Sequence, residues 1–198
     1  MGLRDRILDA AVAVLRERGL GAATTKEIAR AAGCSEGSLY TYFATKEQLL
    51  HAVMAERLPP FIPLLQGLLE RAGEATLAEH LEEVARLAVP YYAEMLPLAG
   101  AALATPDLRE GLRRQNLGPH RANAAVVSYL RLEQRLGRVR AQANLEAGAA
   151  LLLGACLQRA MNQPFTGQAP DTTADDRFVT DLVVTLLQGL QPDERRRR

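Results

Sequence analysis

Tryptophan is absent from this sequence, and aromatic residues make up only 5% of it. The apolar residues, 48% of the chain, are mainly alanine and leucine, which favour helices. No stretch of useful length alternates between apolar and polar residues as a half-buried strand does. The sequence therefore predicts an all-α fold, and its 198 residues suffice for a small domain joined to a larger one.

Cysteine is nearly absent as well. Cys34 and Cys156 lie far apart and form neither a metal-ligand spacing nor a disulfide framework, which is typical of a reducing compartment. The longest apolar run, around 147–157, is too short to cross a bilayer. The N-terminal segment contains Asp5 and Asp9 and no cleavage site, so it reads as a helix rather than a signal peptide. We expect a soluble, cytoplasmic protein with no membrane partner.

A large excess of positive charge is also missing, since the formal net charge is +1. Without the terminal run Arg195–Arg198, 20 basic residues face 23 acidic ones. Any binding to nucleic acid would therefore depend on local charge. Only Lys26 and Lys46 are lysines, against 22 arginines, and these two lysines flank one short segment.

Motifs of known catalytic sites are missing too. The sequence contains no phosphate-binding glycine loop, no Gly-x-Ser-x-Gly and no His-Glu-x-x-His. The three histidines are far apart, and the polar group Glu79, His80, Glu82 and Glu83 reads as the solvated face of one helix. We predict no enzyme activity, no catalytic residue, no metal site and no cofactor. A helical-bundle enzyme whose pocket forms only in three dimensions stays an alternative.

Helix start and stop signals recur along the whole chain. They predict about nine helices in two unequal groups, a front group of three short helices and a larger bundle. The helix that starts at Thr45 would link the two groups. The long helix that starts at Thr76 is expected to break near Pro90 and Pro97.

The segment 24–49, TTKEIARAAGCSEGSLYTYFATKEQL, contains three helix starts joined by tight turns. Thr24-x-x-Glu27 and Thr45-x-x-Gln48 are capping boxes. Gly33 supplies a positive φ and Ser35 caps the next helix, so the chain can turn sharply. Two short helices at a steep angle, the second with a polar outer face, indicate a helix-turn-helix.

The outer face of this motif has the residue types that DNA binding needs. Small polar residues and a glycine on this face allow close approach to base edges in a major groove. The residues on or near the outer face of the second helix are Ser35, Glu36, Gly37, Ser38, Thr41 and Tyr42. Tyr40, Tyr42 and Lys46 can reach backbone phosphates. Thr24, Thr25 and Lys26 open the first helix of the motif, where free N–H groups favour a phosphate.

These residues resemble the DNA-binding domain of TetR-type (TetR/AcrR) transcriptional regulators. The resemblance rests on Thr-Thr-Lys-Glu-Ile-Ala, on Ala-Gly-Cys-Ser-x-Gly-Ser-Leu-Tyr-x-Tyr-Phe and on Thr-Lys-Glu-x-Leu, and it covers about residues 1–61. The segments 136–140 and 177–183 are similar to segments of the family's larger domain. The resemblance implies a DNA-binding domain over 1–61 with its motif at about 24–43, a ligand-binding and dimerisation domain over 62–190, and a basic disordered tail over 191–198.

The family resemblance also implies how DNA would be bound. An all-α homodimer would place one helix per subunit in successive major grooves of a palindromic operator. The base-reading positions would be Lys26, Ser35, Glu36, Gly37, Ser38 and Thr41, and the phosphate contacts Thr25, Tyr40, Tyr42 and Lys46. Cys34 departs from the more usual valine. Glu36 places a carboxylate near DNA, where phosphate would repel it unless it accepts a hydrogen bond from a cytosine.

The larger domain contains candidates for a dimer interface. Residues 145–161 are apolar nearly all round, and the last helix has two apolar stripes. We expect one stripe to face the protein's own core and the other a second subunit, in a four-helix interface. The candidate interface residues are Leu151, Gly154, Ala155, Phe178, Leu182, Val183 and Leu186.

Family members usually bind an inducer among the helices of this domain, so the resemblance also implies a ligand site. The candidate residues are Met54, Phe61, Tyr91, Tyr92, Met95, His120, Asn123, Cys156, Arg159 and Asn162, each of which has a plain structural role as its alternative. Their mostly apolar character favours a lipophilic or acyl-type molecule. The expected partners are thus double-stranded operator DNA, a second copy of the chain and a small inducer.

Two further interpretations stay open. Cys34 and Cys156 would allow a thiol redox switch, although neither has a lysine or histidine beside it in sequence to lower its pKa. A helix-turn-helix protein that only bends DNA is another class, but such a protein would not need the large second domain.

Overall fold

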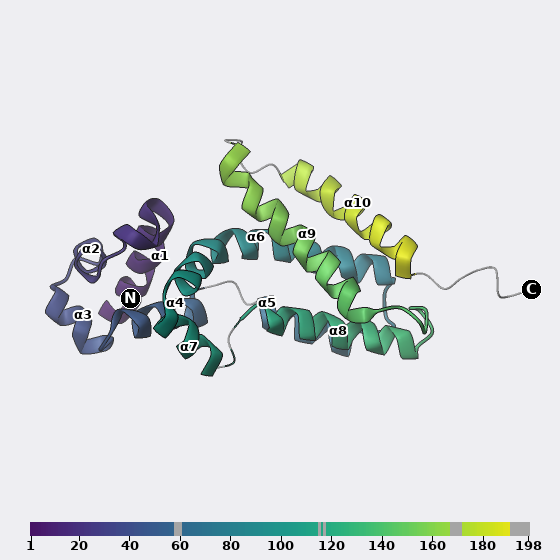
Figure 1. Ribbon diagram of the computed structural model, residues 1–198, viewed down its shortest axis with the longest axis horizontal. Coiled ribbons are helices and arrows are strands. Elements are labelled where there is room, and N and C mark those ends of the chain that lie inside the picture. Colours follow the sequence, from purple (N-terminus) through teal and green to yellow (C-terminus); the bar gives the residue numbers. More distant parts are fainter. Residues whose placement is uncertain (58–60, 115, 117, 167–171, 191–198) are drawn as a thin grey trace, which may run out of the picture. The chain divides into compact units, whose positions relative to one another are not determined.

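The computed structural model describes residues 1–57, 61–114, 116, 118–166 and 172–190 (Figure 1). Every regular element among these residues is a helix, which confirms the predicted all-α fold. The helices are α1 (Leu3–Ala22), α2 (Thr25–Ala31), α3 (Glu36–Tyr42), α4 (Lys46–Glu56), α5 (Phe61–Glu70), α6 (Leu77–Ala104), α7 (Pro106–Arg114), α8 (His120–Arg135), α9 (Leu145–Thr166) and α10 (Thr172–Leu190). The predicted basic tail, 191–198, lies outside the described residues.

Contacts divide the chain into two compact units. Unit 1 comprises 1–59 together with 94–118, and unit 2 comprises 60–93 together with 119–198. The helix α6 contributes its first part to unit 2 and its last part to unit 1. No pattern in the sequence indicated that 94–118 would join the N-terminal residues. The functional division near residue 61 stays a prediction.

The short helices of unit 1 begin where their caps predict. The hydroxyl oxygens of Thr24, Ser35 and Thr45 each accept a hydrogen bond from the backbone N–H three residues later in the sequence, at 3.2, 3.0 and 3.2 Å. These bonds satisfy backbone N–H groups that a helix start leaves free. Gly33 has φ 69°, so the chain turns there without the strain a side chain would add. The result is three helices within about 30 residues, as the motif requires.

A single hydrophobic core holds these helices together. Ile28 and Leu39 are fully buried, and Cys34 packs against the same core while remaining partly exposed. Residues from α6 and α7 join them, namely Leu98, Leu108 and Leu112. The inner side of the helix-turn-helix formed by α2 and α3 is therefore held in place by burial of apolar surface, the main stabilising term in folding.

Two clusters of ion pairs also fasten the start of α1 to the end of α4. The Arg4 guanidinium donates to both carboxylate oxygens of Glu56, at 2.7 and 2.6 Å. Arg57 donates to Asp5 at 2.9 Å and to Asp9 at 2.7 Å. Hydrogen bonding to Arg4 lowers the pKa of Glu56, and hydrogen bonding to Arg57 lowers the pKa of Asp5.

Unit 2 is a bundle in which α8 packs against both α5 and α9, and α9 packs against α10 (Figure 1). The prediction that α6 breaks near Pro90 and Pro97 is wrong, because α6 runs unbroken from Leu77 to Ala104. A proline removes one helical hydrogen bond. Burial of the apolar residues Leu81, Val84, Ala85, Ala88 and Val89 along α6 offsets that loss.

The interior of unit 2 contains a polar chain that sequence analysis missed. His80 Nδ1 lies 2.8 Å from the Tyr129 hydroxyl, and one turn further along α8 the fully buried Glu133 lies 2.9 Å from Nε of Arg138. The second Glu133 oxygen accepts from the backbone N–H of Gly73 at 3.1 Å. The interpretation of residues 79–83 as a solvated face is thus wrong for His80, which points inward to a partner on another helix.

By length and composition alone, α6 could cross a membrane. The core helix of a water-soluble protein satisfies the same criteria. Arg86, in the middle of α6, forms ion pairs with Glu82 and Asp176 at 2.6 and 3.3 Å. A water-soluble protein with no membrane partner remains our prediction.

Candidate DNA-binding surface and ligand-binding residues

The predicted DNA-binding residues lie on α2, on α3 and at the start of α4. Most of them are exposed, namely Thr24, Lys26, Ser35, Gly37, Tyr40, Thr41 and Tyr42. Glu36, Ser38 and Lys46 are half-buried, and Thr25 is buried. The exposed fractions of Tyr40 and Tyr42 are 45% and 46%, so two aromatic side chains of α3 are left facing solvent. Exposed aromatic and hydroxyl groups on one short helix suit an interaction surface.

Several hydroxyl groups of α3 have partners within the helix. Ser35 and Ser38 place their hydroxyl oxygens 2.8 Å apart, and the Thr41 hydroxyl donates to the carbonyl oxygen of Gly37 at 3.2 Å. These bonds restrict the side-chain rotamers, which reduces the entropy that an interaction with DNA would have to overcome. Gly37 has no side chain to hold α3 away from a surface in front of it.

Glu36, the acidic residue of α3, is connected to side chains of both α2 and α3. Its carboxylate accepts a short hydrogen bond from the Thr25 hydroxyl at the start of α2. The Thr25 oxygen also lies 3.3 Å from the Tyr40 hydroxyl. Glu36, Thr25 and Tyr40, the Glu36 cluster, thus connect the first residue of α3 to α2 and to the middle of α3. The unfavourable negative charge of Glu36 beside DNA was evident from the sequence, whereas its hydrogen-bond partners were not.

Three of the predicted ligand-binding residues come together in unit 2. The rings of Phe61 and Tyr91 stack with centroids 4.7 Å apart, and Tyr92 lies edge-on to both, at 6.2 and 5.4 Å. Cys156 is buried too, with its sulfur 3.9 Å from the carbonyl oxygen of Ala85. Burial raises the pKa of Tyr91 and of Tyr92. This aromatic cluster joins the start of α5 to α6.

The other predicted ligand-binding residues are more scattered. Met54 and Met95 belong to unit 1, whereas His120, Asn123 and Asn162 are exposed residues of unit 2. Arg159 donates to Asp175 at 2.9 Å, and its guanidinium lies 5.4 Å from the centre of the Phe178 ring. In this structure Arg159 therefore has a structural role, because its guanidinium forms a salt bridge with Asp175.

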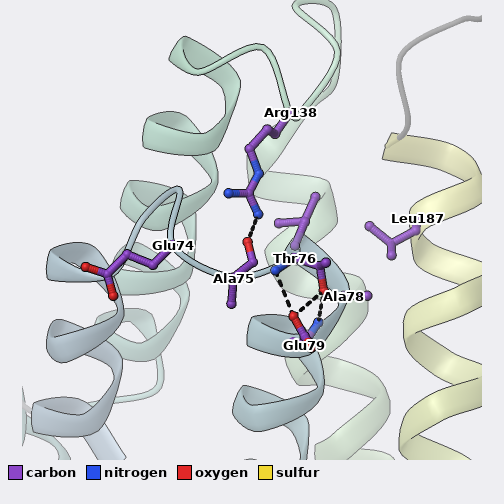
Figure 2. Close-up of a pocket in the computed structure, with 8 residues that line it drawn as sticks. Glu74, Ala75, Thr76, Ala78, Glu79, Arg138 and Leu187 are labelled. Atoms are coloured by element: carbon purple, nitrogen blue, oxygen red, sulfur yellow. Dashed lines mark hydrogen bonds between the residues drawn. The ribbon is translucent and has the colours of Figure 1, made fainter.

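A cavity of about 670 Å³ lies elsewhere in unit 2 (Figure 2). Its lining contains none of the predicted ligand-binding residues and consists of Glu74, Ala75, Thr76, Leu77, Ala78, Glu79, Arg138 and Leu187. Figure 2 shows the partners of two of its charged side chains: Arg138 donates to the carbonyl oxygen of Ala75, and the Glu79 carboxylate accepts from the backbone and the hydroxyl of Thr76 at 2.8 and 2.7 Å.

The two cysteines lie in different units. Cys156 is fully buried, and burial raises the pKa of its thiol to about 12. A thiol with so high a pKa is almost entirely protonated at neutral pH and therefore unreactive. Among the described residues, no three side chains of histidine, cysteine, aspartate or glutamate are placed to hold a metal ion.

The predicted dimer residues separate into two groups. Leu151 and Gly154 on α9 are exposed, and Ala155, Phe178 and Leu182 are partly exposed. Val183 and Leu186 on α10 are buried inside the unit, with 0% and 8% exposure. Residues buried in this way belong to the inner stripe of α10, so we remove these two from the candidate interface.

Two short, capped helices with an exposed polar face define a helix-turn-helix protein of the DNA-binding class. Residues 7–53 match the family described as bacterial regulatory proteins of the tetR family. TtgW of Pseudomonas putida, an HTH-type transcriptional regulator, is 37% identical over 101 residues, which span 49% of this chain and 74% of TtgW. The chain belongs to the TetR family of transcriptional regulators.

Further comparisons agree with this assignment. SrpR of Pseudomonas putida, another HTH-type transcriptional regulator, is 37% identical over 101 residues, which span 49% of this chain but only 46% of SrpR. A TetR-family structure from Mesorhizobium loti has a TM-score of 0.75 at 21% identity, with 96% of this chain and 97% of that one covered. FadR of Bacillus subtilis in complex with stearoyl-CoA has a TM-score of 0.69 at 20% identity, with 94% and 99% covered. The two structures show a shared fold.

Proposed function

We propose that this regulator is a cytoplasmic homodimer that represses transcription by binding a palindromic operator through α3, and that a lipophilic or acyl-type ligand releases it. The observation that carries the proposal is the outer face of α3, where Tyr40, Thr41 and Tyr42 are exposed on a helix that the core fixes from behind. Lys46 and Lys26 supply positive charge beside this face. Phosphate contacts of this kind position a protein on DNA, and base contacts select the sequence.

Dimer formation is supported by the apolar surface of α9 and α10. Leu151 is 63% exposed, and among the described residues no atom outside the local backbone of α9 lies within 4 Å of the place that a Cβ would take at Gly154. Together with the partly exposed Phe178 and Leu182, these residues form an outer stripe beside the buried one. Two such stripes from two subunits would bury apolar surface that water otherwise solvates. The two copies of α3 in the dimer would then enter successive major grooves of the DNA.

An apolar ligand is supported by the aromatic cluster of Phe61, Tyr91 and Tyr92. Aromatic and aliphatic linings with few polar groups suit lipophilic molecules. FadR of Bacillus subtilis, whose fold is similar, binds stearoyl-CoA. The ligand can change operator affinity only if it binds the DNA-free conformation more tightly than the DNA-bound one.

The direct test is to select genomic fragments bound by the purified full-length chain and to align them. The expected result is an inverted repeat with half-sites about one helical turn apart. Long-chain acyl-CoA, a free fatty acid and a short-chain acyl-CoA are then added to the complex. Release by only the long-chain compounds supports the proposed ligand class. Fragments without a common inverted repeat would contradict the proposed mode of DNA binding.

A further inference from the structure

The Glu36 cluster links a carboxylate to the Thr25 hydroxyl and, through Thr25, to the Tyr40 hydroxyl, and both hydroxyl groups are predicted to contact DNA phosphates. At neutral pH a carboxylate is only an acceptor, so the hydrogen of the Thr25 hydroxyl points to Glu36. The Thr25 oxygen then accepts from the Tyr40 hydroxyl, 3.3 Å away. The hydroxyl hydrogens of both residues are therefore used inside the protein.

A hydroxyl binds phosphate by donating its hydrogen to a phosphate oxygen. Thr25 can do so only after it leaves Glu36, and Tyr40 only after it leaves Thr25. Every DNA sequence presents the same phosphates, so this cost applies to every sequence. The negative charge of Glu36 beside the backbone adds to the cost at low salt.

The position of Glu36 provides a way to recover that cost at selected sites. Glu36 is the first residue of α3 and is half-buried, so part of its side chain faces solvent. The first residues of a recognition helix are those that reach base edges in the major groove. The base donor that a glutamate accepts from is the amino group of cytosine.

We propose that Glu36 is a specificity-determining residue that couples phosphate binding to recognition of a cytosine. In the free protein its carboxylate holds the hydroxyl group of Thr25, and the Thr25 oxygen in turn holds the hydroxyl group of Tyr40. At a half-site with a cytosine in reach, the carboxylate turns to the cytosine amino group and releases the Thr25 hydroxyl, which can then leave Tyr40 and donate to the DNA backbone. At other sites the release is not compensated. This inference rests on the proposed insertion of α3 into the major groove.

The test uses the full-length chain and three DNA probes: the selected operator, the operator with one C·G pair per half-site replaced by T·A, and an alternating A·T duplex. The variant Glu36→Ala removes the carboxylate. We expect it to bind the A·T duplex about 3- to 10-fold tighter, because one or two hydroxyl donors become free. We also expect the preference for the C·G pair, about 5- to 150-fold in the unmodified protein, to disappear at that position alone.

The variant Thr25→Val tests whether competition for the hydroxyl, rather than charge, causes the change. It keeps the shape of the side chain and loses the donor. In the Thr25→Val background, Glu36→Ala should give a smaller gain on the A·T duplex. With Thr25 unmodified, the gain in affinity that Glu36→Ala brings on the A·T duplex should also persist at high salt, where repulsion between charges is screened.

Other results would overturn the inference. If Glu36→Ala bound all three probes more tightly by the same factor, the effect of Glu36 would be general charge repulsion and not recognition of a cytosine. Equal weakening together with a lower unfolding temperature would make the Glu36 cluster a structural connection between α2 and α3. If the unmodified protein binds none of the probes more tightly than random DNA, the proposed function itself fails, which is a distinct outcome.

Discussion

Tyr129 and His80, 49 residues apart in sequence, are joined by a hydrogen bond in the interior of unit 2. Both side chains are nearly or fully inaccessible to solvent. Buried polar groups are costly unless they have partners. The hydrogen bond between His80 and Tyr129 supplies such partners and connects α6 to α8. One turn further along α8, Glu133 accepts a hydrogen bond from the Gly73 N–H and forms an ion pair with Arg138.

Glu133→Ala should therefore destabilise the protein by about 3 kcal/mol, the usual result of removing one partner from a buried ion pair. Arg138 would lose its carboxylate partner and Gly73 its hydrogen-bond acceptor. Urea unfolding at one fixed protein concentration measures the loss. Glu133→Gln keeps an acceptor for Gly73 and should lose less.

Glu146→Ala is the control for this experiment. Glu146 on α9 forms an exposed ion pair with Arg131 on α8 at 3.4 Å, in the same unit as Glu133. Exposed pairs contribute about 0–1 kcal/mol, so little change is expected. Equal destabilisation by Glu133→Ala and Glu146→Ala would show that the buried pair has no special weight.

Gly111→Ala should disturb the contact between α4 and α7 in unit 1. A Cβ at Gly111 would lie 2.1 Å from Cε1 of His51, whose Nε2 lies 3.2 Å from the carbonyl oxygen of Leu108. The imidazole must move away from this carbonyl, and overpacking of this kind costs about 1–3 kcal/mol. A lower midpoint of thermal unfolding is the expected result.

Gly100→Ala is a matched control, because Gly100 lies in a helix of the same unit and, in the part of the chain that the structure describes, no atom outside its local helix backbone is within 4 Å of the added Cβ. It should leave stability unchanged or raise it by about 1 kcal/mol through helix propensity. The double variant His51→Ala/Gly111→Ala should recover part of the loss, since the steric conflict is gone. A Gly111→Ala protein as stable as the unmodified one would contradict the packing described for His51.

The local part of this architecture could be predicted from sequence. Thr24, Ser35 and Thr45 cap helices through bonds that span three residues, so a short window contains the whole cause. The role of His80 could not be predicted, because its partner is distant in sequence and the alternation of polar residues on α6 looks the same for a solvated face. The prediction of a helix break at Pro90 failed for a related reason. Proline disfavours a helix interior locally, but the burial of apolar residues along α6 outweighs that cost, and a short window of sequence does not contain the buried contacts.

The same distinction applies to the candidate site. The Ser-Glu-Gly-Ser run indicated a reading helix, and the polar residues of α3 are mostly exposed. The bond from Thr25 to Glu36 depends on the angle between two helices, which no propensity encodes. Val183 and Leu182 are neighbours in sequence, and only packing shows that one faces the core and the other is partly exposed.

Leu151→Glu should convert the proposed dimer into a monomer without unfolding it. Leu151 is 63% exposed in the single chain, so the charge costs little there and several kcal/mol if it is buried in an interface. Sedimentation at micromolar concentration measures the mass. Leu136→Glu, at a residue with 57% exposure outside the proposed interface, should leave the mass unchanged. An equal mass for Leu151→Glu and the unmodified protein would remove α9 from the interface.

The buried thiol of Cys156 should make the free energy of unfolding depend on pH in the alkaline range. Burial raises the pKa of its thiol from 9.0 to about 12. The unfolded chain therefore releases this proton before the folded one does, so the thiol contributes stability below pH 9 that is lost as the pH rises towards 12. Cys156→Ala should lessen the pH dependence of the free energy of unfolding by about 1.4 kcal/mol per pH unit in that range.

Thiol chemistry gives an independent check on Cys156. At pH 8, Ellman's reagent should modify it only after denaturation, and peroxide should leave operator affinity unchanged if no redox switch operates. Fast modification of Cys156 in the folded protein, or loss of DNA binding after peroxide treatment, would favour the redox alternative.

Lys46→Gln should lower the salt dependence of operator binding. An ammonium group that neutralises a phosphate releases bound counterions, and each such contact adds about 0.9 to the slope of log K against log salt. With one Lys46 per subunit, a dimer should lose about 1.8 of that slope. Tyr42→Phe removes a neutral hydroxyl, so it should weaken binding with no change in slope. Anisotropy titrations between low and physiological salt separate the two, and an unaltered slope for Lys46→Gln would place Lys46 away from the DNA backbone.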